Sequence, residues 1–199
     1  AALVFHPTID EVYPEGPVEP SVPVADLALR LEGERRPGHF AGVVEVVARL
    51  FRAVGPCRAF FGQKDFQQLQ VVRRMVVDLG LPVEVVGCPT SREPDGLARS
   101  SRNVYLTGAE RAAAPVLHRA LLAGFAAVAV PGWDRTAVEE MMVDMVADES
   151  AASVEYAVVV DPSTLLAAAE PTAGRELRLL VACRFGRARL IDNLGAVAG

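Results

Sequence analysis

The chain has 199 residues, which is enough for one large domain or two small ones, and we expect two. With 51% apolar and 23% charged residues it can bury a sizeable core, which excludes a disordered or low-complexity chain. Lysine and arginine total 20 against 25 aspartates and glutamates, so the net charge of −5 provides no overall positive field for nucleic acid or an anionic membrane.

The first quarter of the chain predicts a short strand, a loop and two helices. Residues 3–5 are apolar and have the pattern of a buried strand, so we expect a further segment ahead of them. Five prolines between residues 7 and 23 are too many for a helix and predict an extended surface loop. Helices are expected over 24–31 and 40–54, the second ending before a Gly-Pro pair.

A strand-helix-strand unit is predicted over residues 57–87. Short apolar strands at 57–61 and 83–87 flank a polar turn and a helix, which ends at Gly80 and keeps its apolar residues on one face. A parallel crossover connection requires about this length. Half of an open α/β sheet is therefore expected here.

The second half of the chain has an α+β pattern. Residues 88–106 are polar, contain two prolines and a glycine, and predict a hinge or an active-site loop. The elements expected after it are helices over 107–125 and 134–148 and strands at about 154–160, 177–185 and 188–192. The boundary falls near residue 90, which gives domains 1–90 and 91–199.

Neither a membrane span nor a disulfide framework is expected. The longest apolar run, residues 120–130, contains Gly124 and stops at Pro131. The three cysteines are odd in number, widely spaced and form no C-x-x-C pair. These features predict a cytoplasmic protein without a structural metal.

The tetrapeptide at residues 62–65 is the first candidate site. It lies where a parallel strand ends and a helix begins, which is where ligands bind in open α/β sheets and where backbone amides favour a phosphate. Lys64 adds a compact positive charge, and Gly62 lets a ligand approach the backbone. The alternative is that Asp65 only caps a helix and Lys64 is a solvated surface charge.

Residues 100–103 are the second candidate. Ser100, Ser101 and Arg102 supply several hydrogen-bond donors within a few residues, which suits polyphosphate oxygens. The two sites could share one nucleotide. An ordinary polar turn ahead of a helix is the commoner explanation of such a segment taken alone.

A third candidate is the start of the 40–54 helix. Arg36 and His39 flank that start, where an anion or a carboxylate would bind, although a lone histidine is usually structural. The sequence has no nucleophilic serine or cysteine motif, no P-loop and no zinc spacing. The candidate groups are therefore phosphate-binding groups and not covalent catalysts.

Five segments resemble, in order, the pantothenate synthetase (pantoate–β-alanine ligase) family. The segments are Tyr13–Gly16, Arg36–Val43, Phe60–Leu69, Asp95–Asn103 and Leu190–Asn193. Each alone is weak, but five at sensible spacings span nearly the whole chain and make the resemblance specific.

The resemblance implies a fold and an activity. The fold would be α/β, with part of a Rossmann-like nucleotide-binding domain containing a parallel sheet, followed by a small α+β lid domain, in a homodimer. The activity would be the condensation of pantoate with β-alanine to pantothenate. ATP and pantoate first give pantoyl adenylate and pyrophosphate, aided by Mg²⁺, and β-alanine then displaces AMP.

The resemblance also implies roles for individual residues. The residues implied to bind ATP are Gly62, Lys64, Asp65, Ser91, Arg99, Ser100, Ser101 and Arg102. Catalysis would rest on Lys64, Ser100, Ser101 and Arg102 among them. Gln68, Arg36 and His39 would face the substrate, and no residue is implied as a metal ligand.

The chain departs from the family pattern at three points. The H-x-G-H motif and the first third of a family member are absent, Gln63 stands where glutamate is usual, and Arg99 stands where methionine or leucine is usual. Arg99 would turn outward if the backbone makes the adenine contact, and would change ATP affinity if the side chain does. We expect these 199 residues alone to be insoluble, inactive or completed by another segment.

Two other functions remain open from the sequence. One is another nucleotidyltransferase of the same superfamily, because a similar serine-arginine grip occurs there. The other is a catalytically silent binding or dimerisation module, which the missing H-x-G-H motif and Arg99 would favour.

Overall fold

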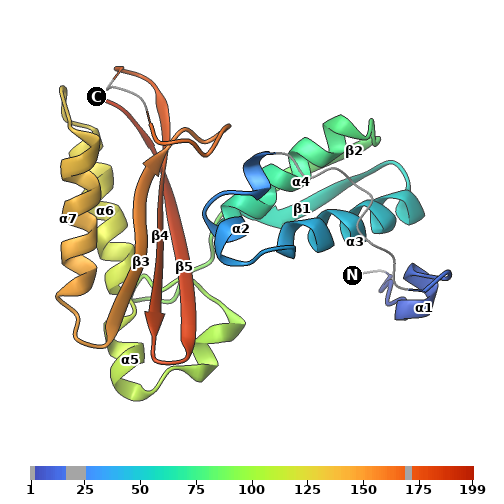
Figure 1. The fold of residues 1–199 in the computed structure, drawn as a ribbon, viewed down its shortest axis with the longest axis horizontal. Coiled ribbons are helices and arrows are strands. Elements are labelled where there is room, and N and C mark those ends of the chain that lie inside the picture. The colour runs from blue at the N-terminus through green and yellow to red at the C-terminus, as the bar shows by residue number, and fades with distance from the viewer. Residues whose placement is uncertain (1–2, 17–25, 169–171) are drawn as a thin grey trace. The chain divides into compact units, whose positions relative to one another are not determined.

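The computed structural model describes residues 3–16, 26–168 and 172–199, which form two compact units (Figure 1). The first unit lies within residues 1–62 and 66–88, and the second contains residues 63–65 and 89–199. The three-residue turn Gln63–Asp65, called the lysine turn below, thus groups with the second unit although the first surrounds it in sequence.

The first unit contains the predicted strand-helix-strand arrangement. Strands β1 (Cys57–Gly62) and β2 (Val83–Cys88) pair in parallel, with Cys57 opposite Val83 and Gly62 opposite Cys88. Helix α4 (Phe66–Asp78) connects them, and α3 (His39–Val54) packs against α4. The parallel sheet of the predicted α/β fold is therefore confirmed.

The start of the chain differs from the sequence prediction. Residues 3–5 form no strand and are largely exposed, because nothing in the described chain pairs with them. A short helix, α1 (Ile9–Val12), interrupts the predicted loop, begins at Thr8 with a capping box to Glu11, and is free of proline. In the predicted helix 24–31, residues 24–25 lie outside the described ones, and the rest forms a 3₁₀ turn (Asp26–Ala28) before α2 (Glu32–Arg35).

In the second unit, the predicted helix over 107–125 is two helices. Helix α5 (Gly108–Ala113) begins at Thr107 with a capping box to Glu110, and α6 (Val116–Val128) follows. The break falls at Pro115, whose ring nitrogen cannot donate the helical hydrogen bond. The predicted helix over 134–148 is α7 (Arg135–Ala147), capped by Asp134.

The second unit is built on an antiparallel sheet in the order β3–β4–β5. Its strands are β3 (Ala152–Val160), β4 (Glu176–Phe185) and β5 (Ala188–Val197). Helices α6 and α7 cover one face of this sheet (Figure 1). Strand β5 is five residues longer than predicted, because it continues past Asp192 through Asn193 to Val197.

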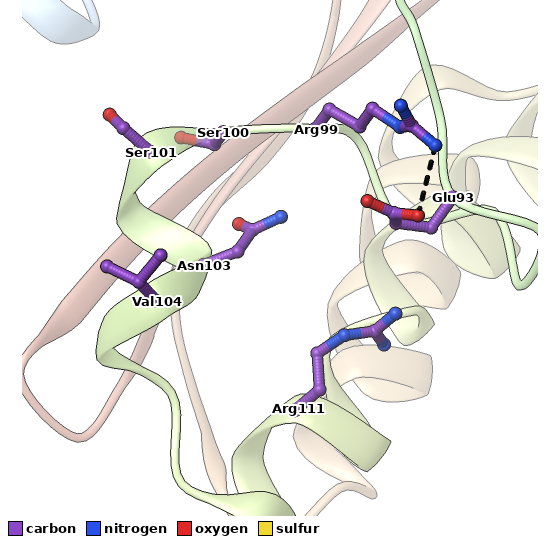
Figure 2. A pocket seen from close by; sticks show the side chains of 7 residues that line it. All are labelled: Glu93, Arg99, Ser100, Ser101, Asn103, Val104 and Arg111. Atoms are coloured by element: carbon purple, nitrogen blue, oxygen red, sulfur yellow. Dashed lines mark hydrogen bonds and ion pairs between the residues drawn. The ribbon is translucent and has the colours of Figure 1, made fainter.

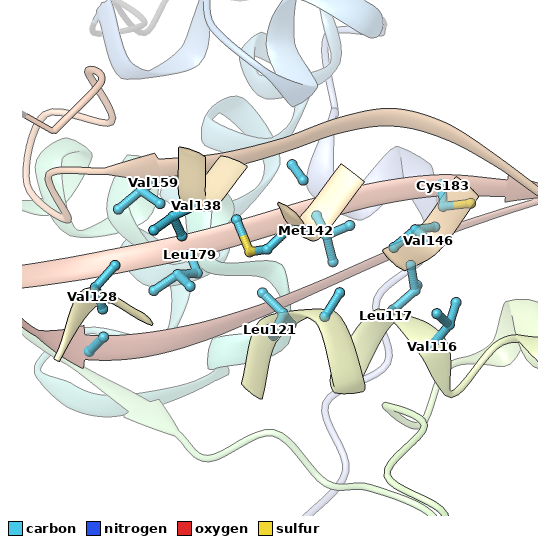
Figure 3. Close-up of a cluster of buried hydrophobic side chains, with 14 of the residues drawn as sticks. Val116, Leu117, Leu121, Val128, Val138, Met142, Val146, Val159, Leu179 and Cys183 are labelled. Atoms are coloured by element: carbon cyan, nitrogen blue, oxygen red, sulfur yellow. The ribbon is translucent and has the colours of Figure 1, made fainter. Parts of the chain in front are cut away.

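The core of the second unit lies between these helices and the sheet. Leu117 and Leu121 of α6 and Met142 of α7 pack with Leu179 of β4, all of them fully buried (Figure 3). No helix in the described ranges is both long and apolar enough to cross a membrane.

Gly124 on α6 tests this packing. A Cβ atom at Gly124 would lie 2.5 Å from Leu179 Cδ2 and 2.6 Å from Met142 Sδ, whereas one at Gly42 on α3 would meet no atom within 4 Å. We expect Gly124→Ala to destabilise the protein by about 1–3 kcal/mol through overpacking. The same change at Gly42 should stabilise it by about 0.5–1 kcal/mol, because alanine favours the helix. Urea unfolding of both variants checks this, and equal signs for the two would contradict the packing described.

Candidate functional site

The lysine turn places one ammonium group in a nearly buried position. The turn is a 3₁₀ helix that follows β1 directly and leads into α4. Lys64 Nζ lies 3.7 Å from Asp65 Oδ1, and the Lys64 side chain is 15% exposed. Lys64 is the only lysine in the sequence. The chain therefore uses arginine elsewhere and a compact, rotatable ammonium group only here.

Asn193 of β5 holds the lysine turn through its side-chain amide. Its Nδ2 donates to the carbonyl oxygens of Gln63, at 3.0 Å, and of Lys64, at 2.7 Å. Its Oδ1 accepts from Nε of Arg178, at 2.8 Å, and from Nη2 of the same guanidinium. The turn is thus attached to the middle of β5, an edge strand of the antiparallel sheet.

The preceding residue, Asp192, binds a second segment. This segment is residues 91–103, which we call the serine loop. Arg92 of this loop makes two hydrogen bonds to the Asp192 carboxylate, at 2.5 and 3.0 Å, and a third to the Gly96 carbonyl oxygen. The Asp192 side chain is only 2% exposed. A buried, bidentate ion pair therefore fixes the start of the serine loop on β5.

The tip of the serine loop is packed against α6. Gly96 has φ +93° and approaches His118 so closely that a Cβ there would lie 2.6 Å from the ring. Glycine at position 96 is thus required both by its backbone conformation and by the lack of space for a side chain.

Burial lowers the pKa of His118. The positive charge of Arg92 lowers it further, whereas the negative charge of Asp192 opposes this shift.

The end of the serine loop presents hydroxyl and amide groups. Ser100 Oγ accepts from the backbone N–H of Arg102 at 3.2 Å and caps the 3₁₀ helix Ser101–Tyr105. Asn103 Nδ2 donates to the Ala98 carbonyl oxygen at 3.1 Å. The Asn103 Oδ1 atom is buried and has no hydrogen-bond partner in the described chain. An orphaned buried acceptor of this kind points to a water or a ligand group that the protein itself does not supply.

Two cavities adjoin these groups. The larger has a volume of about 540 Å³ and is lined by Glu93, Arg99, Ser100, Ser101, Asn103, Val104 and Arg111 (Figure 2). The smaller, of about 10 Å³, lies where the lysine turn meets the serine loop. Lys64, Ser100, Asn103 and Asp192 provide its polar wall. It offers room for about one water molecule.

The structure brings some of the predicted residues together and leaves others apart. Lys64 and Ser100 line the same small cavity, and Asp65 contacts Lys64. Ser101 and Arg99 join Ser100 around the larger cavity. Ser91 and Arg102 are exposed and line neither cavity, although the Ser91 carbonyl oxygen accepts from the Arg99 N–H at 2.9 Å.

The other predicted residues belong to the first unit. Arg36 Nη1 and His39 Nε2 are 3.0 Å apart at the start of α3. Gln68 is partly exposed in the first turn of α4, and Gly62 ends β1.

Arg99 borders the larger cavity with a mostly exposed side chain. Its side chain is 59% exposed, and its Nη2 lies 3.3 Å from Glu93 Oε2 (Figure 2). Arg111 forms a 2.5 Å hydrogen bond to Asp95, which lowers the pKa of that carboxyl. The larger cavity is thus bordered by guanidinium groups that carboxylates already hold.

Sequence reasoning missed the residues that support the site. Arg92, Asn103, Asp192 and Asn193 stood in or near the motif segments, but no role was predicted for them. The pairs Arg92–Asp192 and Lys64–Asn193 are separated by 100 and 129 residues. Only residue covariation among relatives could have shown these contacts from sequence. No cluster of three or more metal-ligating side chains occurs among the residues the structure describes.

Comparison with known proteins identifies similar chains. The family described as pantoate-beta-alanine ligase matches residues 1–195. The pantothenate synthetase of Herpetosiphon aurantiacus is 49% identical over 194 residues, which are 96% of this chain and 69% of that protein. The pantothenate synthetase of Thermus thermophilus is 51% identical over 197 residues, or 96% of this chain and 68% of the relative. This chain thus spans about two thirds of the length of the curated relatives it matches.

Solved structures agree with this result. The crystal structure of the Thermus thermophilus pantothenate synthetase has a TM-score of 0.86 at 51% identity, and the match covers 94% of this chain and 67% of the other. The Francisella tularensis pantoate-beta-alanine ligase, complexed with beta-gamma ATP and beta-alanine, has a TM-score of 0.68 at 28% identity. That match covers 93% of this chain and 61% of the other.

The ion pair between Arg92 and Asp192 gives a stability prediction. Asp192→Asn leaves a mostly buried guanidinium without its carboxylate, which should lower the free energy of unfolding by about 3 kcal/mol. Glu149→Gln removes a far more exposed pair with Arg119, whose side chain is 53% exposed, and should cost less than about 1 kcal/mol. Urea unfolding of the two variants measures both costs. Equal costs would mean that the Arg92 pair does not anchor the serine loop.

Proposed function

The chain belongs to the pantoate–β-alanine ligase family. We propose on this basis that the protein uses ATP to condense pantoate with β-alanine, through a pantoyl adenylate. The observation that carries this proposal is the meeting of the lysine turn with the serine loop. Lys64 and Ser100 come from segments 36 residues apart and line one small cavity, with the orphaned Asn103 Oδ1 beside them. A shared ligand explains why both segments are fixed on the same strand.

The donor set suits the phosphates of ATP. Lys64 provides an ammonium group, Ser100 and Ser101 provide hydroxyl groups, and Arg102 makes no ion pair within the described chain. Such donors match the oxygens of a triphosphate. The ligase complex from Francisella tularensis, which contains beta-gamma ATP, supports the same assignment. We propose that Gly62, Asp65, Ser91 and Arg99 complete the ATP site.

The first step needs charge stabilisation and no protein nucleophile. The pantoate carboxylate attacks the α-phosphorus, a new P–O bond forms, and the bond to the pyrophosphate breaks. Negative charge grows on the phosphoryl and leaving oxygens. Lys64 and the serine hydroxyl groups would donate to these oxygens as fixed, preorganised donors.

Mg²⁺ would be held by the phosphates rather than by a protein cage. Magnesium commonly binds through substrate phosphates, a few waters and one or two carboxylates. The described ranges contain no group of three or more carboxylate, histidine or cysteine side chains that could hold a metal ion. When bound, it would neutralise charge on the leaving pyrophosphate.

The second step would form the amide. The amine of β-alanine attacks the acyl carbon of the adenylate, the C–N bond forms, and AMP leaves with the electron pair of the acyl C–O bond. The amine proton passes to the departing AMP or to solvent. Gln68, Arg36 and His39 are proposed to hold the carboxylate substrates. We further propose that the protein is a cytoplasmic homodimer.

Two other activities are separated from this one by their products. Pyrophosphate release that depends on pantoate, with AMP appearing only after β-alanine is added, supports the ligase. Transfer of the adenylyl group to a phosphate ester would instead indicate another nucleotidyltransferase. A chain that binds neither ATP nor a pantoyl adenylate mimic would be a silent module.

Lys64→Ala provides the direct test of the ammonium group. Loss of one well-placed donor should slow pantoate-dependent pyrophosphate release in the full-length protein by roughly 100- to 1,000-fold. Arg73→Ala, which removes an exposed cation from α4, is the matched control and should leave the rate within about twofold, because an exposed surface charge contributes little. Near-parental adenylate formation by the Lys64 variant, with folding intact, would overturn the proposal.

A further inference from the structure

We propose that Asn193 is a positioning residue for the reaction, which sets the place of Lys64 by holding the backbone of the lysine turn. This inference rests on the proposed function, because it assigns a role in the same site. Asn193 does not line either cavity and would not touch the substrates. It would act only through the carbonyl oxygens of Gln63 and Lys64.

Strand geometry explains how one strand supports two segments. Side chains of successive residues in a strand point to opposite faces of the sheet. Leu190 and Ala196 belong to the core beneath α6 and α7, so Asp192 shares that face and Asn193 takes the other. Asp192 therefore reaches Arg92 of the serine loop, while Asn193 reaches the lysine turn. The spacing between the two segments is fixed by adjacent residues of β5.

The orientation of the Asn193 amide is determined by its neighbours. Arg178 is a donor only, so the atom that faces its guanidinium must be the amide oxygen. The amide nitrogen then faces the two carbonyl oxygens of the lysine turn, which accept only. An asparagine fits between a guanidinium and a pair of carbonyls. Aspartate would satisfy the first partner and repel the second.

Burying Asn193 and the Arg178 guanidinium costs free energy, which indicates that these groups serve to position the lysine turn. Asn193 is buried, and Arg178 beside it is largely buried as well, which lowers the pKa of the guanidinium to about 10. Charged groups in such places seldom add stability relative to apolar side chains. What the arrangement provides is two short hydrogen bonds to consecutive carbonyls at the only lysine of the chain.

The experiment compares Asn193→Asp with Asn193→Ala in the full-length protein. The aspartate variant keeps an acceptor for Arg178, so it should remain folded, although its thermal midpoint should fall because the carboxylate repels the two carbonyl oxygens. It lacks the N–H groups, so kcat for pantoyl adenylate formation should fall by roughly 100-fold, as expected for a reacting group misplaced by about 1 Å. KM for ATP should change much less. Asn193→Ala should lose both stability and rate.

A second readout does not depend on activity. Because Lys64 is the only lysine of these 199 residues, a small amine-acylating reagent followed by peptide mass spectrometry reports on the lysine turn alone among their side chains. Acylation of Lys64 should be faster in Asn193→Asp than in the parent, because the turn is no longer held. The matched control is Arg189→Gln, a change at another position of β5 that removes an ion pair with Glu155 of β3. It should change neither the rate of adenylate formation nor the rate of Lys64 acylation.

Every outcome decides the inference. Parental kcat and parental acylation in Asn193→Asp would show that the amide serves Arg178 only, and would overturn it. Unfolding of the aspartate variant would also overturn it, because the role would then be structural. A parent protein that releases no pyrophosphate with pantoate would instead refute the proposed function, while the acylation comparison would still test the hold on the turn.

Discussion

Two consecutive buried side chains in the middle of β5, Asp192 and Asn193, are the constraint on which the candidate site depends. One binds the guanidinium of the serine loop and the other binds the carbonyls of the lysine turn. A slip of one residue in the pairing of β4 and β5 would exchange their faces and release both segments. The register, which places Glu176 opposite Val197 and Phe185 opposite Ala188, therefore determines whether both segments are held.

This polar pair depends on a well-packed support. The α6 and α7 side chains bury one face of the sheet, the face that Asp192 shares, and Gly124 lets α6 approach Leu179 and Met142 closely. Close packing makes the sheet rigid, because close-packed protein interiors have low compressibility. A rigid sheet can fix two loop segments relative to each other more precisely than the loops could themselves. Precision of this kind is what transition-state stabilisation by fixed donors requires.

Much of the fold could be predicted from sequence patterns. Helical spacing of apolar residues predicted α3 and α4, and short apolar runs predicted β1 and β2. The errors have local causes. Pro115 divides a helix that periodicity alone would continue, and the polar Asn193 interrupts the apolar pattern, so the predicted β5 stops at Asp192 and is too short. Residues 3–5 looked like a buried strand, but apolar composition does not supply a pairing partner.

The sequence allowed us to predict the polar groups proposed to bind ATP, but not the β5 residues that hold their segments in place. Lys64, Ser100 and Ser101 stand in short segments whose chemistry is visible in sequence. Their attachment to β5 depends on contacts between residues 100 and 129 positions apart, which no local pattern encodes. Arg99 illustrates the same limit, because its pairing with Glu93 could not be predicted from the sequence.

The most direct test of the account is a double-mutant cycle between Lys64→Ala and Ser100→Ala, measured as pantoate-dependent exchange of pyrophosphate into ATP. If both groups hold the same phosphates, their effects are not additive, and the double variant should be faster than the product of the two single losses by at least about twofold, or roughly 0.5 kcal/mol of coupling. Strictly additive losses would show that the two segments act on separate ligands, which contradicts the account.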